Sequence, residues 1–443
     1  MSFLVSPGVH VKEIDLTNVV PSVDTTIGAL AAPFTKGPVS KVVTLTSEAD
    51  LVKNFGKPNT SNYEWWFTAS NFLKYSNTLK VVRPESGFLN AGEASGVLVQ
   101  NDDVYFASYY SETGDGQVTT NDWYAREAGT LGNSLRLEVC PSATAYEQDL
   151  GVGNLVNGAG AVGDDTITVD DADGSGFAFQ VGDMIKFHTN DSITATSNGA
   201  ITTASINLTV DANSGTIAVG NRVIAAGIDE VVTVKTVTSQ TALILDKPIT
   251  IANDVAMAFS TYASVEDGNK EYQVTAINSE VLSIRLKDDA DSGGLQTIIP
   301  DNSFITRRWR FSDRFDGAPR TSAWNTQNGR GAGDEIHVVV FDGTGDITGF
   351  KVDVAGQRTA AIIETYGNLS KNPSAKGPQG DSIYYPTVFF NQSDFVYWGD
   401  HIAAGTNWGT DTTTAYTELK PITLVTFTGG TDDFAVTAGE LEL

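Results

Sequence analysis

The sequence predicts an α+β multidomain protein in which a discontinuous α/β core domain is interrupted by a long β-rich insertion of small β-barrel or sandwich modules. Two observations lead to this prediction. Apolar residues recur at helical spacing only towards the two ends of the chain, within residues 23–85 and 335–400, which we assign to the core. Between them, short β-branched runs alternate with Gly, Asp, Ser, Thr and Asn, which is typical of small all-β domains.

The first core segment, residues 23–85, is expected to fold in the order β-β-α-α-β. Its five elements are predicted at residues 27–34, 41–47, 48–56, 62–76 and 78–84. Ser47 is placed to cap the first helix, and Gly56 lies where its C-cap belongs. The second helix is predicted from an apolar face at helical spacing, formed by Tyr63, Trp66, Phe67, Ser70 and Leu73.

The insertion is expected to begin with a small β/α region, residues 86–145, followed by β-rich modules over residues 146–300. The modules contain a weak internal repeat, in which residues 167–170 and 181–185 correspond to residues 208–211 and 219–223. Each copy predicts a strand, a turn and a strand, with Gly182 or Gly220 in a tight turn. Residues 270–286 predict a hairpin around Asn278 and Ser279.

The chain is expected to return to the core through a linker, residues 301–334. The elements predicted after it are a strand at 334–342, a turn-rich connection at 341–349, a helix at 355–371 and strands within 381–398. The helix is predicted from an apolar face formed by Ala360, Ile363 and Leu369.

The chain of 443 residues is strongly acidic, with a net charge of -26. Residues 86–300 hold 29 acidic and 9 basic residues, a net charge of -20. Such a chain repels the phosphate backbone, so no direct contact with nucleic acid is expected. The simplest interpretation of the charge is a solubilising surface. No apolar run approaches the ~20 residues of a membrane helix, and no signal peptide is evident, so no membrane insertion is expected.

No group of residues predicts catalysis. The four histidines, His10, His188, His337 and His401, are far apart and lack metal-ligand spacing. His337 and Cys140 lie in strand-like runs, where packed side chains are expected. The Gly-rich stretch 328–335 leads into a strand, so we interpret it as a loop without a phosphate site. We therefore expect no enzyme activity, no catalytic residue and no cofactor.

One stretch resembles a calcium loop. Residues 170–176 begin like an EF-hand, but the position of the bidentate glutamate is occupied by Gly182. A tight EF-hand is thus excluded, and no metal site is expected.

A short arm at the N-terminus, residues 1–22, is separated from the core by breaks. Pro7-Gly8 precedes a strand-like segment and Pro21 follows it. Val9 and Val11 would point to one side of such a strand. We therefore ask which strand this arm pairs with.

Six blocks in order along the chain resemble the tail sheath protein of contractile-tailed bacteriophages. They read SPGVHVKEID, TSEADLVKNFGKP, LKVVRP, DEIHVVVFDGTGDITG, ETYGNLSK and GDSIYYPTVFFNQSDFVYW. The resemblance covers residues 1–85 and about 301–430, whereas the insertion matches only in being β-rich.

The resemblance implies a structural subunit of the virion tail, assembled in the host cytoplasm. Copies would form stacked hexameric rings around the tail tube and contract to drive the tube through the host envelope. Besides other copies, the implied partners are the tail tube protein and the baseplate and tail terminator proteins. The arm would add a strand to a neighbouring subunit, with Val5, Val9, Val11 and Ile14 in contact, and Asn18 and Pro21 as the hinge.

Sheath proteins of this kind continue into a large C-terminal domain, of which residues 401–443 would be only the start. We therefore expect a chain that lacks most of that domain. An alternative function is a receptor- or carbohydrate-binding module of a phage structural protein, in which exposed Trp123 and Tyr124 would form a sugar platform.

Overall fold

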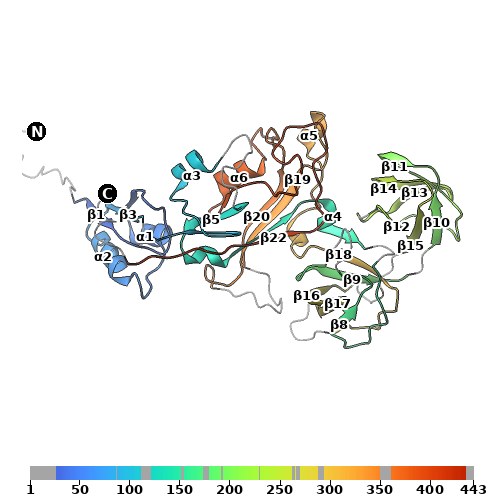
Figure 1. Cartoon of the computed structure of the whole chain (residues 1–443), viewed down its shortest axis with the longest axis horizontal. Helices are drawn as coiled ribbons and strands as arrows, with labels where there is room; N and C mark the ends of the chain where they lie inside the picture. The colour runs from blue at the N-terminus through green and yellow to red at the C-terminus, as the bar shows by residue number, and fades with distance from the viewer. Residues whose placement is uncertain are drawn as a thin grey trace, which may run out of the picture. The chain divides into compact units, whose positions relative to one another are not determined.

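The computed structural model describes residues 26–85, 87–110, 121–150, 154–172, 179–190, 193–228, 230–261, 265, 270–287, 294–349 and 361–435 (Figure 1). The chain divides into two compact units. Unit 1 is residues 1–86 with 434–443, and unit 2 is residues 87–433.

Unit 1 has the predicted order of elements, β-β-α-α-β. They are β1 (Gly28–Ala31), β2 (Val43–Leu45), α1 (Glu48–Phe55), α2 (Tyr63–Leu73) and β3 (Leu79–Val82). The central strand β3 pairs in parallel with β1 and antiparallel with β2. The predicted cap is confirmed, because the Ser47 hydroxyl accepts a hydrogen bond from the backbone N–H of Asp50 at 3.2 Å.

The two helices of unit 1 share a core with one face of its sheet. Leu51, Phe55 and Trp66 from the helices pack with Leu45 and Val81 from the strands. Side chains alternate across a strand, so the next residues point to the opposite face. There Ala29, Lys80 and Thr44 lie in one row across the three strands and are exposed.

Unit 2 has a central part with two sheets and one shared core. The four-stranded sheet has the order β20-β19-β6-β22, and the three-stranded sheet has the order β21-β5-β4. The strands are β4 (Asn90–Gly92), β5 (Trp123–Ala128), β6 (Leu135–Cys140), β19 (Glu335–Asp342), β20 (Ala361–Ser370), β21 (Val396–Trp398) and β22 (Thr423–Thr426). The helices are α3 (Asp102–Ser108), α4 (Ala143–Tyr146), α5 (Ala323–Gln327) and α6 (Tyr385–Gln392), with 3-10 turns at Thr130–Ser134 and Ser312–Arg314.

The predicted union of residues 23–85 with 335–400 in one core is not confirmed. Strands β19 and β21 pair with β6 and β5, which belong to residues 86–145, and not with a strand of unit 1. Their shared core is rich in aromatic side chains, including Trp123, Tyr385 and Trp398.

Three predicted elements need correction. Residues 361–370 of the predicted helix at 355–371 form strand β20, because β-branched residues there pair with β19; residues 355–360 lie outside the described residues. The predicted strands at 381–398 contain helix α6, in which Pro386 occupies the first turn, where proline is compatible with a helix. The predicted linker at 301–334 contains α5 and a strand of the β-rich modules.

The β-rich modules are two six-stranded barrels. The first barrel consists of β7 (Glu147–Asp149), β8 (Thr166–Thr168), β9 (Met184–His188), β16 (Tyr272–Asn278), β17 (Val281–Leu286) and β18 (Phe304–Arg308). The second barrel consists of β10 (Ile193–Ser197), β11 (Ile201–Asp211), β12 (Arg222–Ala225), β13 (Val234–Ser239), β14 (Ala242–Ile251) and β15 (Ala256–Ser260). The second barrel is inserted between β9 and β16 of the first (Figure 1).

Both sheets close on themselves and enclose separate apolar cores. In the first barrel the backbone N–H of Asp170 donates to the carbonyl of Leu155 at 2.9 Å, which joins β8 to the segment after β7. In the second barrel the N–H of Val223 donates to the carbonyl of Val232 at 2.9 Å, which joins β12 to the segment before β13. Closure leaves no long open sheet edge.

The weak sequence repeat corresponds to a repeat of hydrogen bonds. Ile167 pairs with Leu282 in the first barrel, as Leu208 pairs with Leu243 in the second. The two predicted turn glycines have positive φ, 103° for Gly182 and 88° for Gly220. Each donates its N–H to a strand carbonyl, of Val274 at 2.7 Å and of Val234 at 2.8 Å respectively. The barrels are therefore two copies of one topology.

The residue that follows the turn glycine has different contacts in the two barrels. Asp183 accepts a hydrogen bond from the N–H of Gln180 at 2.8 Å, as Asn221 does from that of Ala218 at 2.7 Å. The Asp183 carboxylate also pairs with the buried Arg307 guanidinium at 2.8 Å. Removing one partner of a buried ion pair costs far more than removing one turn hydrogen bond.

We predict that Asp183→Ala lowers the free energy of unfolding by about 3–5 kcal/mol, and Asn221→Ala by about 1 kcal/mol. Urea unfolding of the full chain measures both. Equal losses at the two positions would contradict the assignment of Asp183 as the structural partner of Arg307.

The second barrel is predicted to be removable. Its entry and exit lie together, because the Ser260 hydroxyl donates to the carbonyl of Thr189 at 3.3 Å. A variant lacking residues 190–261 keeps residue 189 and residues 262–271 to connect β9 with β16. This connection is longer than the loop 226–233, which joins β12 and β13, the strands of the second barrel that correspond to β9 and β16.

We expect this variant to fold cooperatively with an unchanged tryptophan emission spectrum, because all seven tryptophans lie outside residues 190–261. Tryptophan fluorescence during urea unfolding is the measurement. A red-shifted spectrum before urea is added would show that the first barrel requires the second.

Candidate assembly surfaces and the polar contacts that support them

The predicted inter-subunit residues lie outside the described part of the chain. These are the arm residues Val5, Val9, Val11 and Ile14 and the hinge residues Asn18 and Pro21. Their roles stay predictions. The described faces of the two units are where other assembly surfaces can be identified.

Helix α2 presents aromatic side chains to solvent along one side. Tyr63 and Phe67, one turn apart, are each 50% exposed, and Tyr75 just after the helix is 92% exposed. We call these three residues the α2 outer face. The expectation that Tyr63 and Phe67 belong to the buried face was wrong, because the core contacts Trp66, Ala69 and Ser70 instead. Helical spacing alone did not distinguish two apolar sides of one helix.

The open face of the unit 1 sheet is also apolar. Ile27 and Val42 are 61% and 58% exposed, and Ala29 lies on the same face beside Lys80. Exposed apolar groups on two sides of such a small unit are typical of surfaces that contact other proteins.

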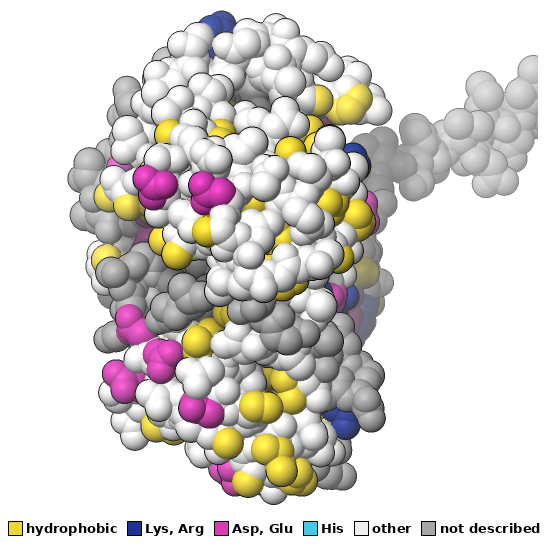
Figure 2. Space-filling model, turned by 90° about the vertical axis from the view of Figure 1, so that its right-hand side faces the viewer, with side chains coloured by type: hydrophobic (Ala, Val, Ile, Leu, Met, Phe, Trp, Pro, Cys, Tyr) yellow, Lys and Arg dark blue, Asp and Glu magenta, His cyan; other side chains and the backbone are white. Residues whose placement is uncertain are grey.

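The two units differ in their net charge. Residues 26–85 contain 7 Lys and Arg against 4 Asp and Glu, whereas residues 87–433 contain 20 against 45. Figure 2 looks onto the end of unit 2 that carries the barrels, and more acidic than basic side chains are visible there. With residues 1–25 and 434–443 included, unit 1 holds 8 basic and 9 acidic residues and is close to neutral, whereas unit 2 is strongly acidic.

A polar cleft of about 350 Å³ lies where the barrels meet the central part of unit 2. Lys186, Lys247, Arg308 and Arg320 line it together with acidic side chains. Glu230 of the second barrel pairs with Lys247 at 3.0 Å and with Arg320 of the central part. The pair of Glu230 with Arg320 connects the second barrel to the central part, whereas the pair with Lys247 lies within the barrel.

Glu271 forms ion pairs with three basic side chains beside this cleft. Its carboxylate pairs with Arg308 at 2.7 Å, Lys287 at 3.0 Å and Lys186 at 3.6 Å. Burial alone would raise the pKa of Glu271, but Arg308 and the two lysines outweigh burial and lower this pKa. Glu271 thus acts as a fixed anion that holds β9, β16 and β18 of the first barrel together.

The two barrels are joined by a buried ion pair. Nη1 of Arg222 in the second barrel lies 3.0 Å from both carboxylate oxygens of Asp149 in the first. The Asp149 side chain is buried, so this contact fixes one barrel to the other rather than serving as an exposed site.

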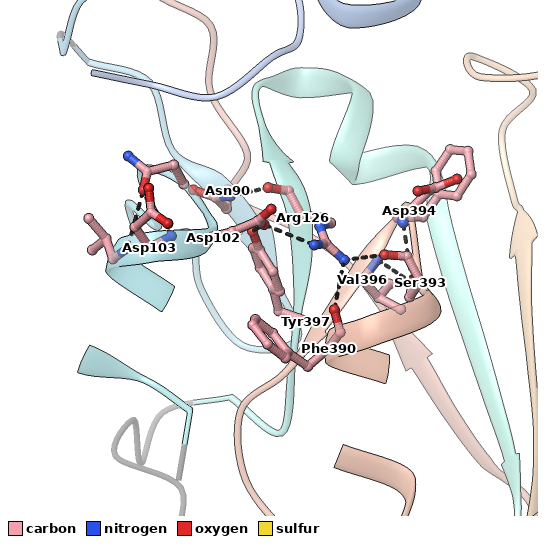
Figure 3. A network of polar contacts seen from close by, with 12 residues as sticks. Asn90, Asp102, Asp103, Arg126, Phe390, Ser393, Asp394, Val396 and Tyr397 are labelled. Carbon is pink, nitrogen blue, oxygen red and sulfur yellow. Dashed lines mark hydrogen bonds and ion pairs between the residues drawn. The ribbon is translucent and has the colours of Figure 1, made fainter. Parts of the chain in front are cut away.

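Arg126 of β5 holds the central part together at another place (Figure 3). Its guanidinium pairs with Asp102 of α3 at 2.9 Å and donates to the backbone carbonyls of Phe390 in α6 and of Ser393 directly after it. It also lies over the Tyr397 ring at 4.9 Å from the centroid. Two helices and two strands are therefore fixed by one side chain.

His337 and Cys140 are packed, as predicted. Nε2 of His337 donates to the carbonyl of Gly317 at 2.8 Å and the ring stacks on Phe315, while burial lowers the pKa of His337. Cys140 is fully buried, and burial raises the pKa of its thiol. Within the described residues, no three His, Cys, Asp or Glu side chains are arranged to hold a metal ion.

Of the two stretches that resemble ligand-binding loops, only the Gly-rich one is described in full. Residues 328–334 lead into β19 as a loop, as predicted. Of the calcium-like stretch 170–176, residues 173–176 lie outside the described residues. Among the described residues, no helix has the length and apolar character needed to span a membrane.

The proposed sugar platform is wrong. Trp123 and Tyr124 are 2% and 0% exposed, in the core of the central part. The Trp123 ring packs edge-on against Phe389 with centroids 4.8 Å apart. These aromatic side chains are unable to stack on a ligand from solvent.

Three carboxylates lie at one end of the three-stranded sheet. Glu93 follows β4, Asp122 precedes β5 and Asp400 follows β21. Burial, helped by the charges of Glu93 and Asp400, raises the pKa of Asp122 to about 7. At alkaline pH the charged Asp122 carboxylate is partly buried beside two other carboxylates, which destabilises the folded state. Protonation of Asp122 removes this destabilisation.

Comparisons with known proteins point to one family. Residues 25–83 match the model of the tail sheath protein Gp18 domain III N-terminal region. The chain is 27% identical over 190 residues to the tail sheath protein of Enterobacteria phage T4, which covers 35% of this chain and 29% of that protein. It is 30% identical over 186 residues to that of Salmonella phage ViI, covering 37% and 28%.

A further relative is the tail sheath protein of Vibrio phage KVP40, 42% identical over 80 residues, which covers 18% of this chain and 12% of that protein. The matches span less than a third of the length of these curated relatives. The resemblance to tail sheath proteins inferred from the sequence is confirmed.

We predict that Asp122→Asn stabilises the protein at pH 8 and that the gain shrinks at pH 5.5. The pKa of Asp122 is raised on folding, so its favourable contribution is present at low pH and is lost as pH rises through about 7. Since the carboxyl is partly exposed, we expect a gain of roughly 1 kcal/mol, or about 2–4 °C in Tm.

Thermal melts at the two pH values measure this gain. The matched control is Asp316→Asn, which removes an exposed charge elsewhere in unit 2. The same gain in both variants, or a gain independent of pH, would contradict the coupling of the three carboxylates.

Proposed function

We propose that this chain, a relative of the phage tail sheath proteins, is a structural subunit of a contractile tail sheath. The observation that carries the proposal is the match of residues 25–83 to a tail sheath domain, together with three relatives that are tail sheath proteins. Residues 25–83 coincide with unit 1 of the structure, which has its own sheet and core.

In the proposed assembly, copies form stacked hexameric rings around the tail tube protein. A signal from the baseplate starts contraction, the tail terminator closes the other end, and the tube is driven through the host envelope. The subunit would be assembled in the host cytoplasm and reside in the virion tail. No enzymatic step is part of this function.

The ion pairs in unit 2 support movement of the subunit as a rigid body. Asp149–Arg222 joins the two barrels, and Glu230–Arg320 joins the second barrel to the central part. A subunit that changes its contacts with neighbours during contraction must keep its own shape, and such internal pairs serve that requirement.

The barrels are proposed to lie on the outside of the sheath. Residues 86–300 carry a net charge of -20, so close packing of equivalent surfaces would be opposed by repulsion within about 8 Å at physiological salt. The alternative function, a receptor- or carbohydrate-binding module, loses its main support with the burial of Trp123 and Tyr124.

The N-terminal arm is proposed to add a strand to a sheet of a neighbouring subunit. Backbone hydrogen bonds would provide affinity, and Val9 and Val11 would enter an apolar groove. Burial of each valine is worth roughly 1.5–3 kcal/mol, and an unpaired carboxylate in the same place costs more than that gain.

We predict that Val9→Asp combined with Val11→Asp abolishes polymerisation of the full-length protein and leaves the melting temperature of the monomer unchanged. Electron microscopy of tubes and a thermal melt of the monomer are the measurements. The control is His10→Asp combined with Lys12→Asp, on the opposite side of the strand, which should weaken assembly less. Normal tubes from the double valine variant would exclude the donated strand.

A further inference from the structure

The sheet of unit 1 has one covered face and one open face. Helices α1 and α2 cover the first, whereas the second bears Ile27 and Val42, which are 61% and 58% exposed. Val82 of the central strand β3 points to the same side as Lys80, because side chains alternate along a strand. The open face is thus an apolar surface that contains the charge of Lys80. Proteins rarely leave such a face of a sheet uncovered.

The chain returns to unit 1 beside the place where it left it. Residues 428–433 of unit 2 run antiparallel to residues 87–92. The two segments stay together up to the boundary of the unit, where the N–H of Gly87 donates to the Asp433 carboxylate at 3.0 Å. Gly87 is the first residue of unit 2, and residues 434–443 belong to unit 1 again.

The register of the two segments indicates where residues 434–443 lie if they continue in the same direction. Two bridges fix this register, Gly92 with Thr428 and Leu89 with Thr431. Three residues back along the first segment thus correspond to three residues forward along the second, which brings Glu440 level with Lys80. Strand β3 is already paired with β1 on one side and β2 on the other. A segment at this level therefore lies over a face of the sheet and not beside β3.

The composition of residues 434–443 matches the open face. Val436, Ala438 and Glu440 are two residues apart, so their side chains share one side of an extended segment. The segment holds two acidic residues and no basic residue, whereas residues 26–85 hold 7 Lys and Arg against 4 Asp and Glu. Two apolar side chains followed by a carboxylate are complementary to an apolar surface that contains a lysine.

We propose that residues 436–443 cover the open face of the unit 1 sheet in the same copy of the chain. Val436 and Ala438 lie on its apolar part near Val82, and Glu440 lies beside Lys80. The contact is made within one copy, so this inference goes beyond the proposed function and does not depend on it. It assigns the open face to the folding of the subunit and leaves the α2 outer face as the exposed apolar side of unit 1.

Photo-crosslinking of the full chain tests which segment covers the open face. A photoreactive phenylalanine replaces Val42 in a dilute mixture of light and nitrogen-15 labelled protein. We expect crosslinks from position 42 to residues 436–443, joining two light or two heavy peptides but not one of each. The matched control carries the same group at position 67 on the α2 outer face and should give no such crosslink. Crosslinks from position 42 to another segment or to a second copy, no crosslinks, or equal crosslinking from both positions overturn the proposal.

Paired substitutions test which side of the segment faces the sheet. Val436→Asp combined with Ala438→Asp places two charges against the apolar surface and should lower the yield of the crosslink from position 42 at least about fivefold. Thr437→Asp combined with Gly439→Asp adds the same charges on the opposite side and should leave the yield within about twofold. Equal losses in the two variants, or no loss in either, overturn the proposed contact.

Discussion

The antiparallel pairing of β6 with β19 is the contact on which the architecture of unit 2 depends. Six consecutive residue pairs, from Cys140↔His337 to Leu135↔Asp342, join the strands, and nearly every side chain in them is buried. One face of the pair fills the large aromatic core, and the other face packs on Trp309 and Phe311. Both barrels lie in the chain between these two strands, so the pair closes the loop that carries them and gives them a fixed base.

Buried ion pairs extend this base into the barrels. Glu138 of β6 accepts a hydrogen bond from Trp309 Nε1 at 2.6 Å and pairs with Arg310, directly after β18 of the first barrel. Such pairs contribute little net stability compared with apolar packing, but they penalise other arrangements of the same elements. Ten of the 20 Lys and Arg residues in residues 87–433 form ion pairs within the described structure. These cations pair with eight carboxylates, so the acidic excess of unit 2 comes from its composition of 20 basic and 45 acidic residues.

Local signals predicted the elements that depend on neighbouring residues. Ser47 as a cap, the order of elements in unit 1, the hairpin of β16 and β17 and the turns at Gly182 and Gly220 all follow from such signals. The predictions that were wrong concern residues whose structure depends on partners far away in the sequence. Residues 361–370 have apolar residues at helical spacing, yet pairing with β19 makes them a strand. No local pattern links Arg126 to Ser393, or tells that Phe67 faces solvent while its neighbour Trp66 is buried.

The insertion of the second barrel within the sequence of the first affects the loops that must close when the first barrel folds. Strands β9 and β16 are hydrogen-bonded neighbours, but the whole second barrel separates them in sequence. Each strand pair of the second barrel is closer in sequence than β9 and β16 of the first barrel, which are separated by over 80 residues. Once the second barrel has formed, the adjacent ends at Thr189 and Ser260 shorten that loop to a few residues. Formation of the second barrel would therefore bring β9 and β16 together, after which β18 can complete the first barrel and the chain can return to pair β19 with β6.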